Sequence, residues 1–379
     1  MKYPILFVFA WICLLSCKVL SQSNAKGTLD QQIPSILDRN ATSFLDDPQI
    51  HSLSIGVFIA EESYIQYYGE LDPAKENKPS DHTLFEIASV SKSFAGTLVA
   101  QSVLDGKIDL DADIRTYLDG DYPNLEFLEH AIKVRHLLTH TAGLPRFLPL
   151  SINDCFETID ETLPFRINKI EEAYSKELFL EDLKSIILQE VPGTVYRYSN
   201  ADVELIALIL ERVYDTTYED LLQEMICEAA GMKQTKIRLS EEEEIKLANG
   251  YGESNMLVPH FSNSLWGAGS GIKSTIPDLM KYVVFHLDST HRAAIESRKL
   301  LYTNGDFRMG YLWPVFTNEE DGTYYQIHGG AFGTQNMLLI APKYNLGISV
   351  LTNQSGPTTQ GKLSLLIDDL FSELKTVGE

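Results

Sequence analysis

The amino-acid sequence predicts an α+β fold, with one antiparallel sheet built from both chain ends, flanking helices and an inserted, mainly helical lobe. Strand-like patterns near the start, helical patterns through the middle and further strand-like patterns near the end are the observations that predict it. We expect residues of about 30–92 and 266–379 to form the α/β lobe, and residues of about 93–265 to form the helical lobe.

The first half of the chain begins with helical spacing from Ile33 to Phe44. Leu53–Ala60 and Tyr64–Tyr68 are rich in β-branched and aromatic residues, so they predict a hairpin with its turn at Glu61–Ser63. Asp72–Asp81 has the Pro, Asn and charge content of a loop. Apolar residues at helical spacing then predict further helices at Ser91–Leu104, Leu180–Gln189, Ala201–Val213 and Tyr218–Ala229.

The last third of the chain changes to strand-like patterns after Trp266. We expect a turn at Pro342–Asn345 and a closing amphipathic helix at Thr358–Lys375. The expected strands are Gly310–Phe316, Tyr324–His328, Gln335–Ile340 and Leu346–Thr352.

The composition limits the classes of protein to which this chain can belong. The chain has 379 residues, of which 44% are hydrophobic and 22% charged, which suits a globular protein with a sizeable core. Its formal net charge of −22 repels phosphate backbones and anionic membranes, which disfavours nucleic acid as a partner. The expected partner is a small-molecule or peptide substrate.

The first 21 residues have the features of a secretory signal peptide. Lys2 is followed by an apolar run from Ile5 to Leu15, and cleavage after Ser21 would start the mature chain at residue 22. The segment Leu14–Cys17 also resembles a bacterial lipobox, which would leave Cys17 lipidated and the protein attached to a membrane. We therefore expect an exported protein, periplasmic or secreted, that meets a membrane only if Cys17 carries a lipid.

Two cysteines, Cys155 and Cys227, follow the predicted signal peptide. An exported chain can join such residues in a disulfide, but their positions in the sequence do not show that they meet. Both a disulfide and two separate thiols remain open.

The segment Ser89-Val90-Ser91-Lys92 places a hydroxyl and an amine three residues apart. Residues at that spacing share one face of a helix, so the amine of Lys92 can reach the hydroxyl of Ser89. A serine hydroxyl needs such a neighbour to accept its proton before it is an effective nucleophile. The Ser-x-x-Lys pattern occurs elsewhere in the chain, but only Ser89 follows an apolar stretch and opens a buried-looking helix.

Two further segments carry candidate functional residues. In Tyr198-Ser199-Asn200, the phenol of Tyr198 can act as a general base, and Asn200 can bind a substrate amide or hold the lysine. In His328-Gly329-Gly330, the imidazole can donate a hydrogen bond to a substrate carboxylate or to the tyrosine. The glycines, Gly330 among them, let a ligand backbone lie close to the strand.

Taken together in this order, these segments resemble the penicillin-recognising serine hydrolases, which include class C β-lactamases, D-alanyl-D-alanine carboxypeptidases and related esterases. Their signature is Ser-x-x-Lys, then Tyr-x-Asn, then a Lys-or-His-x-Gly triplet. The resemblance covers roughly residues 45–375 and includes several longer segments: Phe85–Lys92, Val134–Pro145, Pro192–Asn200, Gly269–Thr275 and Met309–Trp313.

The resemblance implies an acyl-enzyme mechanism without a cofactor. Ser89 would attack a carbonyl, Lys92 and Tyr198 would move the proton to the leaving group, and water would release the acyl group. The backbone N–H groups of Ser89 and Ala331 would form the oxyanion hole. Whether Lys92 or Tyr198 is the base stays open at this point.

One residue departs from the pattern of many β-lactamases, which carry lysine where this chain has His328. A neutral imidazole holds a substrate carboxylate less firmly than an ammonium does. We therefore expect peptidase or esterase activity to exceed β-lactamase activity. The alternative is a binding or sensor protein on the same fold that acylates slowly or not at all.

His136 and His140 are four residues apart, a spacing that metal ligands on a helix can have. A zinc peptidase of that type needs glutamate directly after the first histidine, and Leu137 occupies that position. We expect no metal and assign this segment a structural role.

Overall fold

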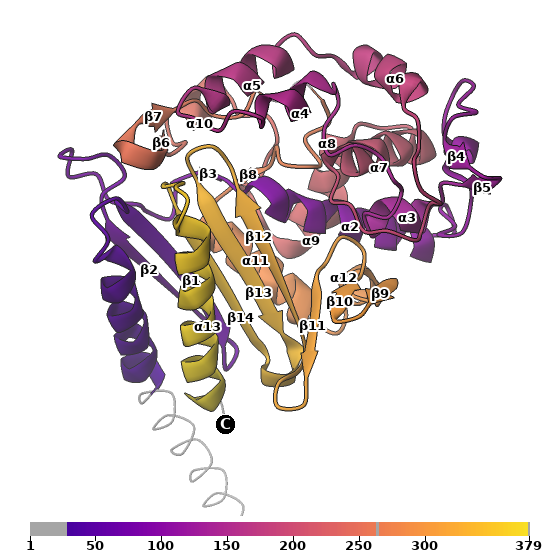
Figure 1. Cartoon of the computed structure of the whole chain (residues 1–379). Coiled ribbons are helices and arrows are strands. Elements are labelled where there is room, and N and C mark those ends of the chain that lie inside the picture. Colours follow the sequence, from indigo (N-terminus) through magenta and orange to yellow (C-terminus); the bar gives the residue numbers. More distant parts are fainter. Residues whose placement is uncertain (1–28, 263–264, 378–379) are drawn as a thin grey trace, which may run out of the picture.

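A six-stranded antiparallel sheet organises the protein (Figure 1). The computed structural model describes residues 29–262 and 265–377, so the predicted signal peptide and Cys17 lie outside the described residues. Both chain ends contribute strands, which confirms the predicted α+β class. In spatial order the strands are β11 (Val315–Asn318), β12 (Gly322–Gly330), β13 (Gln335–Ala341), β14 (Leu346–Thr352), β1 (Ser52–Ile59) and β2 (Glu62–Gly69).

The two ends of the chain meet at the pairing of β1 with β14, where Ser54 lies opposite Leu351. On its other side β1 forms a hairpin with β2. The hairpin turn consists of Ala60 and Glu61, both with left-handed backbone angles (φ 51° and 64°). The turn therefore starts one residue earlier than the sequence predicted, because a two-residue hairpin loop matches the twist of the strands.

Alternating side chains of the sheet enter two separate cores. Leu53, Ile55 and Val57 of β1 point to one face, where residues 29–45 and α13 (Thr359–Val377) form covering helices. Phe58 and Leu338 point to the opposite face, which is covered by α11 (Ile276–Leu287) and the helical part of the chain. Figure 1 shows α13 lying across the sheet on the face away from that helical part.

The remaining helices come mostly from the middle of the sequence, as the patterns predicted. Short helices follow one another at η2 (Ile114–Tyr117), α3 (Val134–Leu138), α4 (Ser151–Cys155), α5 (Leu163–Glu171), α6 (Lys176–Ser185), α10 (Glu241–Glu244) and α12 (Arg292–Ser297). The predicted helix at Tyr218–Ala229 is divided into α8 (Tyr218–Leu222), a π-helical turn (Gln223–Cys227) and α9 (Glu228–Ala230).

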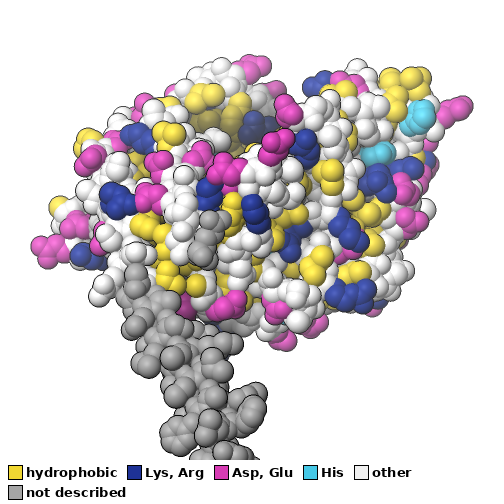
Figure 2. Space-filling view, turned by 90° about the horizontal axis from the view of Figure 1, so that it is seen from below, with side chains coloured by type: hydrophobic (Ala, Val, Ile, Leu, Met, Phe, Trp, Pro, Cys, Tyr) yellow, Lys and Arg dark blue, Asp and Glu magenta, His cyan; other side chains and the backbone are white. Residues whose placement is uncertain are grey.

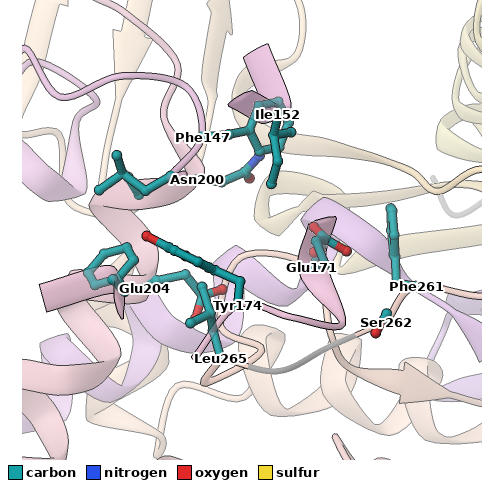
Figure 3. Close-up of a pocket in the computed structure, with 13 residues that line it drawn as sticks. Phe147, Ile152, Glu171, Tyr174, Asn200, Glu204, Phe261, Ser262 and Leu265 are labelled. Carbon is teal, nitrogen blue, oxygen red and sulfur yellow. The ribbon is translucent and has the colours of Figure 1, made fainter. Parts of the chain in front are cut away.

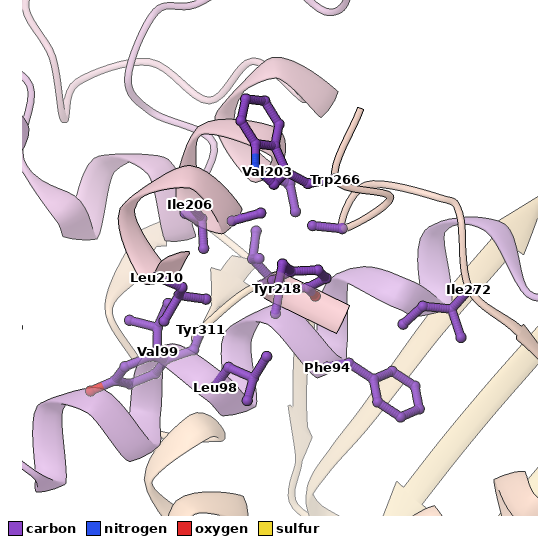
Figure 4. Packing of buried hydrophobic residues seen from close by; sticks show 14 of the residues in the cluster. Phe94, Leu98, Val99, Val203, Ile206, Leu210, Tyr218, Trp266, Ile272 and Tyr311 are labelled. Atoms are coloured by element: carbon purple, nitrogen blue, oxygen red, sulfur yellow. The ribbon is translucent and has the colours of Figure 1, made fainter. Parts of the chain in front are cut away.

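Two long helices, α2 (Ser91–Leu104) and α7 (Asn200–Tyr214), pack against each other in the larger core. Figure 4 shows Leu98 and Val99 of α2 facing Ile206 and Leu210 of α7. All four side chains are buried, and burial of each contributes about 1.5–3 kcal/mol. This contact fixes the start of α2 relative to the start of α7, and both starts carry predicted site residues.

The predicted helix at Leu180–Gln189 is wrong in its second half, because α6 ends at Ser185. The side chain of Asn124 donates hydrogen bonds to the carbonyls of Leu183 (2.8 Å) and Ile186 (3.0 Å), where the helix ends. This tertiary contact replaces the next turn of the helix.

The predicted strand at Gly310–Phe316 is also wrong over most of its length. Its central residues form a buried turn between β10 (Phe307–Met309) and β11, closed by a 2.8 Å hydrogen bond from the N–H of Gly310 to the carbonyl of Trp313. Leu312 takes a left-handed backbone angle (φ 60°), which a strand does not allow. The residues are apolar because they fill the core beside α2, where the Tyr311 carbonyl contacts Gly96.

The surface carries both signs of charge. Figure 2 shows one face, on which acidic and basic side chains are interspersed. In the described part of the chain, no helix combines the length and apolar character needed to cross a membrane. Cys155 and Cys227 are both free thiols, so of the two possibilities left open the structure has separate cysteines.

Candidate active site

Ser89 lies at a sharp turn between a short strand and a helix. β3 (Phe85–Glu86) pairs with β8 (Lys273–Ser274) and leads into the 3₁₀ turn Ala88–Val90, which runs directly into α2. Ala88 has a left-handed backbone angle (φ 45°) that bends the chain here. Ala88 and Val90 are buried, whereas Ser89 is partly exposed, so the turn presents the Ser89 hydroxyl to solvent.

Lys92 lies one turn along α2 and is only 2% exposed. Its ammonium donates three hydrogen bonds: to Ser89 Oγ (3.1 Å), to Asn200 Oδ1 (2.7 Å) and to the carbonyl of Gly269 (2.5 Å). An ammonium has three donors, so all of them are used. The bonds to Asn200 and Gly269 hold the nitrogen in place beside the serine.

Tyr198 approaches the same serine from the start of α7. Its hydroxyl lies 2.6 Å from Ser89 Oγ, and its ring centroid lies 4.9 Å from the Lys92 nitrogen. Ser199 caps α7, since its Oγ accepts the N–H of Asp202 (3.0 Å) and donates to the carbonyl of Pro145 (2.7 Å). The structure thus brings the predicted residues Ser89, Lys92, Tyr198 and Asn200 into one hydrogen-bonded group.

A buried pair, His140 and Asp202, packs against the Tyr198 ring, and the sequence did not predict this pairing. Nδ1 of His140 lies 3.3 Å from Oδ2 of Asp202, and the His140 ring centroid lies 4.7 Å from that of Tyr198. Burial, and next the charge of Lys92, lower the pKa of His140 to about 3. Burial also raises the pKa of Asp202 well above its usual range, which favours the uncharged form of both groups. No sequence signal distinguishes these residues from surface ones.

The segment that contains His328 runs along the nucleophile turn. Gly329 lies so close to Ile87 that a Cβ at this position would be 2.2 Å from the Ile87 carbonyl oxygen. Asn336 of β13 joins the two segments, because its Nδ2 donates to the carbonyls of both Ile87 and Gly329 (3.1 Å each). Only glycine fits at position 329, which explains the first glycine of the pair physically.

His328 itself is not part of the hydrogen-bonded group around Ser89. Its Nε2 is hydrogen-bonded to Oε1 of Gln335, on the neighbouring strand. Burial lowers the pKa of His328, which keeps the imidazole neutral at pH 7. Within the described residues no hydrogen bond joins His328 to Tyr198.

The backbone N–H of Ala331 donates to the carbonyl of Thr334 (2.9 Å) in the turn after β12. This amide is one of the two predicted oxyanion donors. This N–H can donate to a substrate oxygen only if it donates to the Thr334 carbonyl at the same time or breaks that hydrogen bond. Gly330, the residue before it, packs against the side chain of Gln335.

Glu204 is a second functional candidate that sequence reasoning missed. It lies one turn into α7 and accepts the backbone N–H groups of Gly269 (2.9 Å) and Trp266 (3.1 Å). Glu204 therefore orients the loop whose Gly269 carbonyl binds Lys92. Burial raises the pKa of Glu204, against the opposing effects of the Gly269 N–H and the Lys92 charge.

A small pocket of about 50 Å³ lies beside Asn200 (Figure 3). Its walls come from α4, α5, α6, the start of α7 and neighbouring residues that include Phe261 and Leu265. Its lining residues are Phe147, Leu148, Ile152, Glu171, Tyr174, Phe179, Asn200, Ala201, Glu204, Phe261, Ser262, Leu265 and Ser270.

His136 and His140, whose spacing resembles that of metal ligands, have other partners in the structure. His140 faces Asp202, and Nδ1 of His136 accepts the backbone N–H of Lys133 (3.1 Å) at the start of α3. Over residues 29–262 and 265–377, no cluster of three or more His, Cys, Asp or Glu side chains is arranged to hold a metal ion.

Comparison with known proteins identifies the family. The Beta-lactamase family profile matches residues 37–370. A beta-lactamase of Providencia stuartii is 25% identical over 349 residues, covering 82% of this chain and 84% of that protein. A beta-lactamase of Escherichia coli K12 is 27% identical over 294 residues, covering 75% of this chain and 71% of that protein.

Solved structures show the same fold. The beta-lactamase/D-alanine carboxypeptidase of Yersinia pestis superposes with a TM-score of 0.77 at 24% identity, covering 92% of this chain and 99% of that one. The family match extends over most of the described residues, from the helix before β1 to α13. The chain therefore belongs to the Beta-lactamase family of the penicillin-recognising serine hydrolases.

Proposed function

We propose that this protein hydrolyses amide or ester bonds through an acyl-enzyme formed on Ser89. One observation carries the proposal: Ser89 Oγ lies within hydrogen-bond distance of both the Tyr198 hydroxyl (2.6 Å) and the Lys92 ammonium (3.1 Å). These three side chains come from two helix starts that are far apart in the sequence. A serine held between a phenol and an amine has the partners that a nucleophile requires.

In the first step Oγ of Ser89 attacks the substrate carbonyl, and its proton passes to the Tyr198–Lys92 pair, which accepts it in the form with one proton missing, either the Tyr198 phenolate or the Lys92 amine. The same pair then gives the proton to the departing amine or alcohol as the carbonyl–heteroatom bond breaks. In the second step water attacks the acyl-enzyme, gives up its proton to the pair, and the acid leaves as Ser89 regains its hydrogen. No cofactor takes part.

Negative charge develops on the carbonyl oxygen in both steps. The backbone N–H of Ser89 at the helix start is one donor for this oxygen, and that of Ala331 is the other. Because the Ala331 N–H donates to the Thr334 carbonyl in the structure, it must share or break that hydrogen bond when it serves as the second donor.

The state of His328 favours substrates other than β-lactams. A neutral imidazole that is already hydrogen-bonded to Gln335 offers no positive charge to the carboxylate that a β-lactam or a D-alanyl peptide carries. Short acyl esters need no such charge. We therefore place ester hydrolysis first, D-alanyl-D-alanine peptides second and β-lactams last.

Mass spectrometry after incubation with a fluorophosphonate or a fluorescent penicillin tests the proposal. We expect one covalent adduct on Ser89, absent in Ser89→Ala. The matched control is Ser372→Ala, because Ser372 is exposed on α13 and repeats the Ser-x-x-Lys pattern with Lys375. Labelling elsewhere, or ester turnover that survives Ser89→Ala, would overturn the proposal.

The fate of the adduct separates enzyme from sensor. Release within the turnover time of the best ester marks a hydrolase, whereas an adduct that persists for hours marks a slowly acylating sensor protein. Complete absence of labelling and of turnover with esters, peptides and β-lactams would favour a binding protein.

We also propose that residues 1–21 direct export. Mass spectrometry of the protein from the producing cell reads the first residue directly. A chain that begins at residue 22 supports signal cleavage, a lipid on Cys17 supports a membrane-attached lipoprotein, and an intact Met1 would contradict both.

A further inference from the structure

We propose that the guanidinium of Arg146 binds a carboxylate group of the substrate, so that the protein selects anionic substrates. This inference rests on the proposed function, because it assigns a substrate class to the same site. It depends on three observations: the contact of the Arg146 segment with the start of α7, the aromatic support of the guanidinium, and the hydrogen-bond donors that the protein leaves unused.

The backbone places Arg146 beside the candidate site. Its carbonyl accepts the N–H of Asn200 (2.8 Å), the residue whose side chain binds the Lys92 ammonium. The preceding carbonyl, that of Pro145, accepts the hydroxyl of Ser199 (2.7 Å). The segment therefore runs along the start of α7, next to the residues that contact the nucleophile and its lysine.

Two aromatic rings support the side chain of Arg146. Its guanidinium carbon lies 5.3 Å from the ring centroid of Phe147 and 5.3 Å from that of Phe156. The two rings stack on each other, with centroids 5.5 Å apart. Phe147 also lines the small pocket beside Asn200, so the rings connect the guanidinium to the site. Such ring contacts attract the cation and restrict its motion, which reduces the entropy that a ligand must overcome.

The N–H donors of Arg146 are available to a ligand. The residue is exposed, and over residues 29–262 and 265–377 its side chain makes no hydrogen bond and no ion pair. By contrast, the neighbouring exposed arginine at the start of α7, Arg197, donates from Nε to Glu190 (3.1 Å). A guanidinium has five donors in a planar fork, and two of them match the two oxygens of a carboxylate.

The charge of Arg146 lies on a different side of the site from His328. The neutral imidazole on β12 offers a substrate no positive charge, whereas a guanidinium is a permanent cation. The acidic residues on either side of Phe156, Asp154 and Glu157, are exposed and form no ion pair with Arg146 in the described part of the chain. In a protein with a net charge of −22, an anionic substrate therefore has a counter-charge beside α7.

Matched esters test the inference. One series compares the mono-4-nitrophenyl ester of adipic acid with that of adipamic acid, its neutral amide, which places the carboxylate on the acyl side. A second compares 4-acetoxyphenylacetate with 4-acetoxyphenylacetamide, which places it on the leaving group. After subtraction of the Ser89→Ala background, we expect kcat/KM for the carboxylate ester to exceed that for its amide partner about fivefold or more in one series, a factor typical of an exposed charge pair.

The variant Arg146→Gln should bring that ratio close to one. Arg292→Gln is the matched control, because Arg292 is an exposed arginine of α12, which contributes no residue to the candidate site, and it should leave the ratio unchanged. A ratio near one in both series for the wild type, or a ratio that Arg146→Gln does not change, would overturn the inference while leaving the proposed function intact.

Salt separates ligand binding from a structural role of Arg146 and needs only the wild-type protein. We expect the ratio to fall towards one as the NaCl concentration rises from about 50 mM to about 500 mM, because ions screen an exposed charge pair. A ratio that salt does not change would overturn the inference even where Arg146→Gln fails to fold.

Nuclear magnetic resonance of the arginine side-chain N–H groups separates the two proposals if no ester is turned over. The Arg146 signal is identified by its loss in Arg146→Lys, and the wild-type protein is then titrated with phenylacetate and with phenylacetamide. We expect phenylacetate alone to shift this signal. No shift with phenylacetate, or equal shifts with both compounds, would overturn the assignment of Arg146 whether or not Ser89 is acylated.

Discussion

Replacing Glu171 by glutamine should make the protein more stable near neutral pH. The pKa of Glu171 is about 8 in the folded protein and has its ordinary value of 4.5 in the unfolded chain. The folded protein therefore binds more protons between these values, and its stability falls as the pH rises through this interval. Each pH unit corresponds to about 1.4 kcal/mol, or about 3 kcal/mol from pH 5 to pH 7.

Solvent in the open pocket reduces this effect, because Glu171 is only partly buried. We therefore expect the free energy of unfolding of Glu171→Gln, relative to wild type, to be about 1–2 kcal/mol higher at pH 7 than at pH 5. Glutamine has nearly the same shape as glutamate and does not ionise in this pH range, so the stability of the variant should lack this pH dependence.

Urea unfolding followed by circular dichroism at pH 5 and pH 7 measures this gain. Wild type, Glu171→Gln and the exposed control Glu181→Gln are compared at each pH, and the control should track the wild type. If the difference in the free energy of unfolding between Glu171→Gln and wild type is the same at both pH values, the reasoning is refuted. Such a result would show that the pKa of Glu171 is not raised in the folded protein.

Three further predictions concern the support of the nucleophile. Ser199→Ala removes the cap of α7 and should lower the free energy of unfolding by about 1–2 kcal/mol in urea; no loss would contradict the capping role. Asp202→Asn keeps an uncharged donor beside His140, so it should retain more activity and stability than Asp202→Leu; equal losses would refute the neutral pair. In Gly329→Ala the new Cβ would lie 2.2 Å from the Ile87 carbonyl oxygen, so Ser89 labelling should slow at least tenfold with unchanged circular dichroism; normal labelling would show that β12 does not set the nucleophile turn.

Two elements that are buried along nearly their whole length were predictable from the sequence. Ser91–Leu104 and Leu346–Thr352 match α2 and β14 in both bounds, because each forms one uninterrupted, mainly buried segment. The predicted bounds were wrong where a contact with a residue far away in the sequence determines the local structure. Asn124 ends α6 early, and the side chains near Leu312 are apolar because a turn is buried, which short apolar runs do not reveal.

The candidate site was predictable to the extent that it follows local geometry. Ser89 and Lys92 are one helical turn apart, so their contact follows from the helix alone. The carboxyl groups of Asp202, Glu204 and Glu171 gave no such signal, because a buried acid and a solvated acid look alike in a sequence. Their roles depend on tertiary burial.

The pairing of β1 with β14 has a consequence for biosynthesis. Ser54 leaves the ribosome long before its partner Leu351, which is made almost 300 residues later. Until then the open edge of β1 has no neighbour, and the apolar side chains on both its faces remain uncovered. A product truncated before β14 cannot complete the sheet, so premature termination should yield polypeptides that proteases remove rather than a smaller working protein.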